Sequence, residues 1–243
     1  MKNGNAVTIL TQPYSANAKI RLMHIVKRIR TFTLRHPLIG PTFWVLSVQY
    51  FLTQLFVASA WPIRFDYRLH AISDLGNTAC GEYAERLVCS PEHAWMNASF
   101  VVLGVTIIIG SALLYQGFKR TAGSLVGFYF MSLAGLGTIF VGLFPENTIS
   151  SLHTIGAFLP FVFGNLSMVV LGLSLDIPRN LKWFTVGFGL VALAALALFV
   201  TGNYLGLGLG GMERIVAYPQ TVWLIVFGVY VSAHQYRTIR LKH

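Results

Sequence analysis

The sequence predicts an all-α fold: a polytopic membrane protein built as a compact bundle of six transmembrane helices. Six uncharged apolar stretches occur in the 243-residue chain, and each is long enough to cross a bilayer, which takes about 20 apolar residues as a helix. Only 11% of the residues are charged and 55% are hydrophobic, with a mean hydropathy of +0.63. Backbone groups in lipid must be hydrogen-bonded within their own segment, so helices are the expected form.

The expected spans follow one another with short connections, except for a longer loop between the first two. They cover residues 38–63, 94–118, 121–145, 154–175, 183–201 and 215–233. Residues 58–60 (ASA) have the form of a signal-peptide cleavage site, but the apolar region before them is too long and follows a 36-residue tail. We expect a transmembrane domain over 38–236, a basic cytoplasmic tail over 1–37, and a short cytoplasmic tail over 237–243.

The N-terminal tail combines positive charge with apolar residues at helical spacing. Ile20, Met23, Val26, Ile29 and Phe32 recur among lysines and arginines, a pattern typical of a helix lying on an anionic membrane surface. For residues 1–18 a disordered basic tail is an equally good interpretation.

The positive charges are distributed unevenly along the chain. Fourteen of the eighteen Lys and Arg residues lie in the two tails or after the second and fourth spans, whereas Arg64, Arg68, Arg86 and Arg214 do not. The positive-inside rule therefore places both termini in the cytoplasm and the first, third and fifth loops outside. We expect a multi-pass protein of the plasma or inner membrane. The net charge of +10 reports this topology, and nothing in the sequence indicates a nucleic-acid partner.

The chain has two cysteines, and both fall in the first outer loop. Cys80 and Cys89 are nine positions apart, and thiols so placed outside the cytoplasm usually pair. We therefore predict a disulfide, with two free thiols as the alternative.

The three outer loops contain most of the ionisable residues. His70 and Asp74 are four apart in the first loop, so a helical turn would place them on one face. Ser73 and Asn77 have the same spacing. The later loops supply four further candidates: Glu146, His153, Glu213 and Arg214.

Three motifs in these regions give the chain a family resemblance. They are residues 70–76 (HAISDLG) with 89–91 (CSP) and 96–97 (MN), residues 141–146 (VGLFPE) with 152–154 (LHT), and residues 211–215 (GMERI) with Tyr218 and Trp223. In this order they resemble the prokaryotic membrane family catalogued as domain of unknown function 998, over roughly residues 40–235. The resemblance implies a compact six-helix membrane protein and no established activity.

All three motifs lie at the outer ends of spans, so we expect their charged groups to meet in one outer-leaflet cluster. Ionisable groups at membrane depth are costly and are usually paired. The expected cluster contains His70, Asp74, His153, Glu213 and Arg214. For Arg214 we expect a two-point bond to Asp74 or Glu146.

Three functions are compatible with such a cluster. The first is a membrane-embedded hydrolase or transferase acting on lipid, in which His70, Ser73, Asp74 and His153 are the candidate catalytic residues. Its histidines and carboxylates could hold a zinc ion that activates water, or Ser73 could be the nucleophile with a histidine as base.

The second function is binding or transport of a lipid or small amphiphile. Asn77, Glu146, Glu213 and Arg214 are then the candidate binding residues, with Arg214 facing a phosphate or carboxylate head. Polar residues inside the spans, such as Gln220, could line the path, although each is better explained singly by an interhelical hydrogen bond. The third is a structural role, in which the cluster is an ion-pair network and the protein assists another membrane component of unknown identity.

Overall fold

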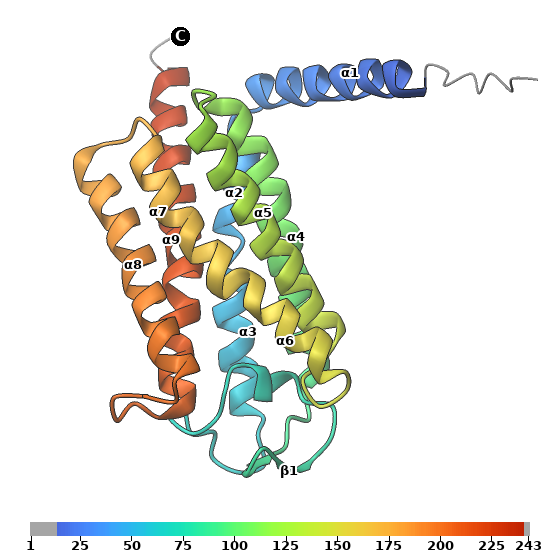
Figure 1. Ribbon diagram of the computed structural model, residues 1–243, viewed down its shortest axis with the longest axis vertical. Coiled ribbons are helices and arrows are strands. Elements are labelled where there is room, and N and C mark those ends of the chain that lie inside the picture. Colours follow the sequence, from blue (N-terminus) through green and yellow to red (C-terminus); the bar gives the residue numbers. More distant parts are fainter. Residues whose placement is uncertain (1–13, 241–243) are drawn as a thin grey trace, which may run out of the picture.

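The computed structural model describes residues 14–240 and confirms the all-α fold with six helices long and apolar enough to span a membrane. The structure says nothing about residues 1–13 and 241–243, so the predictions for those parts of the two tails lie outside the described residues. The spans pack side by side as a bundle, with a small loop region at one end (Figure 1). We call this the loop end and the opposite one the terminal end.

The expected first span is two helices instead of one. Helix α2 (Ile39–Val45) and helix α3 (Val48–Ser59) are separated by a two-residue turn, and together they form the first span candidate. The span also ends at Ser59, four residues before the predicted end at Ile63. Trp61 packs on Phe65 there, with ring centroids 4.8 Å apart, so the last apolar residues belong to the loop end.

The next two spans agree with the prediction to within two residues. Helix α4 (His93–Gly117) and helix α5 (Ala122–Leu143) lie side by side (Figure 1). Their backbones approach closely, because a Cβ atom at Gly104 would overlap the carbonyl oxygen of Gly135. In lipid the hydrophobic effect does not drive helices together, and the close packing that small residues allow stabilises their association instead.

The fourth span contains an irregular turn at its middle. Helix α6 (Ser150–Leu159) passes through a π-helical turn, η2 (Pro160–Gly164), into helix α7 (Asn165–Ser174). Proline lacks the backbone N–H and crowds the preceding turn, so the widened turn accommodates Pro160 without breaking the span. Such bulges occur frequently at functional sites.

Helix α8 (Arg179–Val200) and helix α9 (Gly208–Arg240) form the fifth and sixth spans. Helix α9 starts seven residues before the predicted span at Ile215. The predicted spans leave the glycine-rich residues 206–211 in the fifth loop, but residues 208–211 form the first turn of α9. Gly210 lets the start of α9 pack directly against the first loop. Its N–H donates to the Arg68 carbonyl at 2.9 Å, and a Cβ atom at this position would overlap the His70 carbonyl oxygen.

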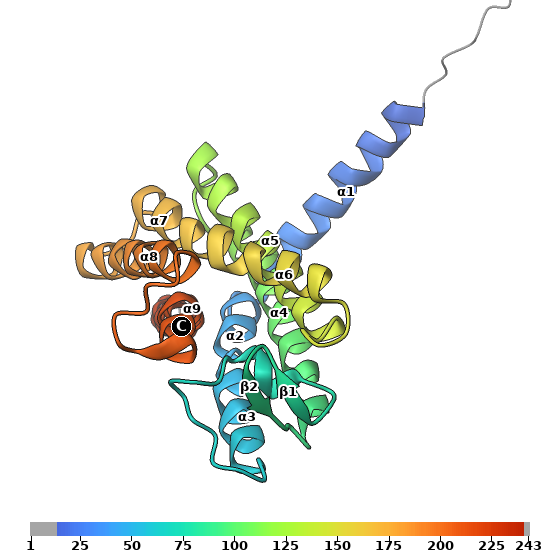
Figure 2. The same cartoon turned by 60° about the horizontal axis from the view of Figure 1, so that its bottom comes forward.

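Helix α1 (Tyr14–Arg35) lies crosswise to the bundle at the terminal end (Figures 1 and 2). Its last turn contains Arg35 and none of its residues is acidic. A basic helix crosswise to the spans has the geometry expected of an interfacial helix.

Five aromatic and aliphatic side chains fill the centre of the bundle. Trp44, Phe128, Trp223, Leu224 and Phe227 are at most 3% exposed. Trp44 lies 5.2 Å from Trp223 and 5.7 Å from Phe227 between ring centroids. We call these five residues the aromatic layer.

Candidate functional site

The first loop crosses the loop end and brings its polar residues against α9. Asp66 fixes the turn that starts this crossing, since its side chain accepts from the Arg68 N–H at 2.8 Å and its carbonyl accepts from the His70 N–H at 2.8 Å. Beyond it, the short 3-10 helix η1 (Ser73–Gly76) carries Ser73 and Asp74. The predicted α-helical turn that would have aligned His70 with Asp74 is absent, since η1 begins only at Ser73.

His70 is held by the protein at both ring nitrogens. Nδ1 accepts a hydrogen bond from the Asp66 N–H at 3.1 Å, so Nε2 carries the proton and donates to the Leu87 carbonyl at 3.2 Å. The ring also packs on Trp61 and Phe65 with centroids 4.8 and 5.2 Å away. These contacts give His70 a structural position and offer no support to its predicted catalytic role.

Asp74 forms a buried ion pair with Arg86, which corrects the expected pairing of Arg214. The two Asp74 oxygens accept from Arg86 Nη2 at 2.9 Å and Nε at 3.1 Å, and Oδ2 also accepts from the Ala71 N–H at 2.7 Å. The Asp74 side chain is fully buried and that of Arg86 is 11% exposed. Arg86 pairs with Asp74 because it follows in the same loop, close enough to η1 for its guanidinium to reach the carboxylate.

Arg214 binds backbone carbonyls where a carboxylate was predicted. Its Nη1 donates to the carbonyls of Tyr67, His70 and Gly210 at 2.7–3.1 Å. The guanidinium also lies over the rings of Phe65 and Tyr67, 5.5 and 5.0 Å from their centroids. Its Nε and Nη2 are buried without a hydrogen-bond partner in the structure. Arg214 thus joins α9 to the first loop.

Glu213 makes the second link between α9 and this loop. Its Oε2 accepts from the Ile72 N–H at 2.6 Å, across 141 positions of sequence. The carboxyl group is buried, and its residue lines the cavity described below. The structure therefore gives a hydrogen bond to the protein for Oε2 of Glu213 and none for Oε1.

Glu146 lies behind η1, in the connection between α5 and α6. Burial and the neighbouring Asp74 carboxylate raise its pKa from 4.5 to about 9, so the group is neutral at pH 7. Its Oε1 is buried without a hydrogen-bond partner. The Tyr83 hydroxyl donates to the Glu146 backbone carbonyl at 2.9 Å, which ties this connection to the first loop.

The His153 ring has two backbone carbonyls of the α5 end, those of Val141 and Phe144, as hydrogen-bond partners. Nδ1 lies 2.9 Å from the Phe144 carbonyl oxygen, and a carbonyl can only accept, so Nδ1 carries the proton in the neutral ring. His153 is buried on α6 and lines the cavity.

A small cavity of about 60 Å³ lies inside the loop end of the bundle, between α3, α4, α5, α6, η2 and α9. Ser73, His153 and Glu213 contribute polar groups to its wall, as do Tyr50, Thr138, Gln220 and Thr221. The remaining lining residues are Ile72, Phe100, Leu103, Val141, Ala157, Pro160, Phe161 and Ala217. Most of the wall is therefore apolar, with a few polar groups among it. Such a composition is typical of a small-molecule site.

The predicted residues are thus divided between the cavity and its support. Ser73, His153 and Glu213 line the cavity, whereas His70, Asp74, Asn77, Glu146 and Arg214 do not. Asn77 is buried, and its backbone N–H donates to the Asp74 carbonyl at 3.3 Å.

The cavity wall also contains Tyr50, Thr138 and Thr221, which were not predicted from the sequence. Polar groups inside apolar spans are the signal that could have indicated them. The same signal did draw attention to Gln220.

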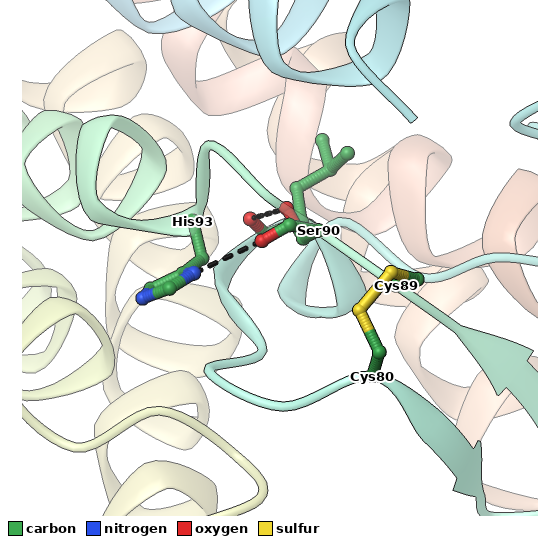
Figure 3. The surroundings of a disulfide bond; sticks show 5 residues. Cys80, Cys89, Ser90 and His93 are labelled. Atoms are coloured by element: carbon green, nitrogen blue, oxygen red, sulfur yellow. Dashed lines mark hydrogen bonds between the residues drawn. A yellow bond between two sulfur atoms is a disulfide. The ribbon is translucent and has the colours of Figure 1, made fainter. Parts of the chain in front are cut away.

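The disulfide between Cys80 and Cys89 forms as predicted, with Cα atoms 4.1 Å apart (Figure 3). It closes a hairpin of strands β1 (Gly81–Tyr83) and β2 (Arg86–Val88). Next to it, the Ser90 carbonyl lies 2.9 Å from His93 Nδ1, at the start of α4 (Figure 3). Since Arg86 pairs with Asp74 and the Leu87 carbonyl accepts from His70, the hairpin is fixed over the crossing loop.

Within residues 14–240, no group of three or more His, Cys, Asp and Glu side chains is arranged to hold a metal ion. The geometry of the described residues therefore gives no support to the zinc form of the hydrolase. The two histidines of the predicted site, His70 and His153, are each engaged with two backbone groups.

The profile of the family described as "Protein of unknown function (DUF998)" matches residues 45–230, which takes in all three motifs and most of the six spans. No curated protein and no solved structure matches the chain.

Proposed function

The chain belongs to the family described as Protein of unknown function (DUF998), and we propose that it binds a lipid or small amphiphile in the cavity at the loop end. The observation that carries this proposal is the composition of the cavity wall. Apolar side chains from five helical segments surround a space within the membrane-spanning bundle, while Ser73, His153 and Glu213 supply polar groups. An amphiphile matches such a wall with its chain and its head, respectively.

The position of the aromatic layer favours binding over passage through the bundle. Along α9 the cavity ends at Thr221, and Trp223, Leu224 and Phe227 follow directly. Trp223 Nε1 donates to Thr185 Oγ1 at 2.8 Å, which fixes this indole. A ligand in the cavity would therefore meet a packed layer before the terminal end.

The polar contacts outside the cavity have a supporting role in this proposal. The Asp74–Arg86 pair and the Arg214–carbonyl bonds hold the crossing loop in place. They fit the structural function predicted as the third alternative, and here they serve to shape the cavity.

Extraction of bound lipid tests the proposal. Ala217 lines the cavity, so Ala217→Phe would fill it, whereas Ala194→Phe makes the same substitution at an exposed position of α8. We expect mass spectrometry to find an amphiphile that remains with the purified wild-type chain and with Ala194→Phe, and that is lost from Ala217→Phe. Equal retention by all three would refute cavity binding.

A hydrolase or transferase is the second candidate, because Ser73 and His153 line the same cavity. The Ser73 hydroxyl would attack the acyl carbonyl of an ester, and its proton would pass to the His153 ring. His153 would give that proton to the alcohol that leaves as the ester C–O bond breaks, and water would then hydrolyse the acyl-serine and restore the Ser73 hydroxyl. No described hydrogen bond joins the two side chains, so we rank this function below binding. A fluorophosphonate adduct on the Ser73 peptide, absent in Ser73→Ala, would support it. If Ser73 is not labelled, the hydrolase or transferase is ruled out and ligand binding stays as the proposed function.

We further propose that the loop end faces outward from the plasma or inner membrane and that both termini are cytoplasmic. The charge asymmetry supports this orientation, and so does the occurrence of the disulfide at the loop end, since disulfides persist in oxidising compartments. The proposed partners are membrane lipids.

A further inference from the structure

We propose that the cavity selects an amphiphile whose head donates hydrogen bonds and carries no negative charge, such as a hydroxyl, amide or amine head. This inference rests on the proposed function and names the chemical class of its ligand. It departs from the sequence-based expectation of a phosphate or carboxylate head bound by Arg214.

The first support is an acceptor in the cavity wall. The protein occupies one oxygen of Glu213 through the Ile72 N–H, and this bond orients the carboxyl group. His153 also lines the cavity, but its ring already has the Phe144 and Val141 carbonyls as backbone partners. The second oxygen of Glu213 is therefore the acceptor that a ligand head with a hydrogen-bond donor would satisfy. Without such a donor, burial of this acceptor carries a desolvation cost.

The second support is that no lysine or arginine lines the cavity. Two arginines of the loop end are engaged elsewhere. Arg86 donates to both oxygens of Asp74, and Arg214 Nη1 donates to three backbone carbonyls. The neutral donors of the wall, Gln220 and Tyr50 among them, can serve an uncharged head. An anionic head would be buried beside the Glu213 carboxyl group without a counter-charge, which is strongly unfavourable.

The unpartnered Nε and Nη2 of Arg214 are the strongest argument for an anion. Arg214 does not line the cavity, however, and its guanidinium lies over the rings of Phe65 and Tyr67. An anion that reached these N–H groups would have to occupy a different place in the bundle. An Arg214 variant therefore separates the two ligand classes in the experiment.

Three amphiphiles with the same chain test the assignment: monooleoylglycerol, oleylamine and oleyl phosphate. Their apparent dissociation constants are measured by native mass spectrometry on the full chain in uncharged detergent. We expect the first two to bind at least about tenfold more tightly than the phosphate, the ratio that corresponds to roughly 1.4 kcal/mol. Ala217→Phe should abolish binding of both, since it fills the cavity.

Variants of the two charged residues sharpen the result. Glu213→Gln keeps an oxygen for the Ile72 N–H and removes the negative charge, so oleylamine should weaken about tenfold while monooleoylglycerol changes little. Arg214→Gln should leave the order of the three ligands unchanged.

The outcomes distinguish this inference from the proposed function. If none of the three amphiphiles binds the wild-type chain, the proposed function fails. If oleyl phosphate binds as tightly as the others and is displaced by Ala217→Phe, the cavity stands and the head assignment is overturned. Phosphate binding that disappears in Arg214→Gln also overturns it. The comparison on the wild-type chain decides the matter even if a variant does not fold.

Discussion

Removal of one partner from the buried Asp74–Arg86 pair should destabilise the loop end strongly. Asp74 is fully buried and receives both Arg86 bonds together with the Ala71 N–H. Asp74→Asn can still accept from Ala71 but leaves the arginine charge uncompensated. Breaking a buried pair in this way costs about 3–5 kcal/mol. Since Arg86 is 11% exposed, we expect the lower part of that range.

A double-mutant cycle isolates the contribution of the pair. Asp74→Asn, Arg86→Gln and the double variant are unfolded reversibly in mixed micelles, and their free energies of unfolding are compared. The double variant should be clearly less destabilised than the sum of the two single ones, by about 2 kcal/mol or more, because neither charge is then left alone. Glu82→Gln, an exposed position on β1, is the control and should change stability by less than about 0.5 kcal/mol. Additive effects of the two substitutions would refute the reasoning.

Three further predictions concern Glu146, the disulfide and the topology. The pKa of Glu146 is raised from 4.5 to about 9 in the folded chain. Its contribution to stability is therefore fully present below pH 4.5 and is lost as the pH rises toward 9. Glu146→Gln should flatten the decline of the unfolding free energy between pH 5 and 8, and an unchanged pH profile would contradict the burial argument. Reduction of Cys80–Cys89 should lower the free energy of unfolding by about 2–3 kcal/mol, as expected for a small closed loop, and alkylation of both thiols in the native, unreduced protein would show that the bond is absent. A cytoplasm-only reporter fused to the C-terminus should be active, and activity of a periplasm-only reporter there would reverse the orientation.

The six spans were predictable because apolar length is a strong signal that each span carries by itself. What the sequence could not give is where backbone turns interrupt that signal. The break between α2 and α3 consists of Leu46 and Ser47. It contains no charged residue, so the apolar stretch is continuous across it. The start of α9 was missed because glycines favour loops in isolation, while here Gly210 gives the crossing loop room to pack against the helix.

The candidate site was predictable as a region and less so in its pairings. The segments around Ser73, His153 and Glu213 do meet at one end of the bundle. The partner of Arg214 was wrong, because a pairing rule based on charge alone overlooks backbone carbonyls, which the crossing loop presents to the guanidinium. Asp74 was already satisfied by Arg86 from its own loop.

The most direct test of the central claim uses a photoreactive amino acid at two phenylalanine positions of the fourth span. Benzoylphenylalanine replaces either Phe161, which lines the cavity, or Phe158, which is exposed on α6. After irradiation in cells, intact-mass and peptide mass spectrometry identify whatever is attached. We predict one narrow class of amphiphile at Phe161 and the broad mixture of bilayer lipids at Phe158. The same lipid mixture at both positions, or no adduct at Phe161, would contradict a ligand-binding cavity.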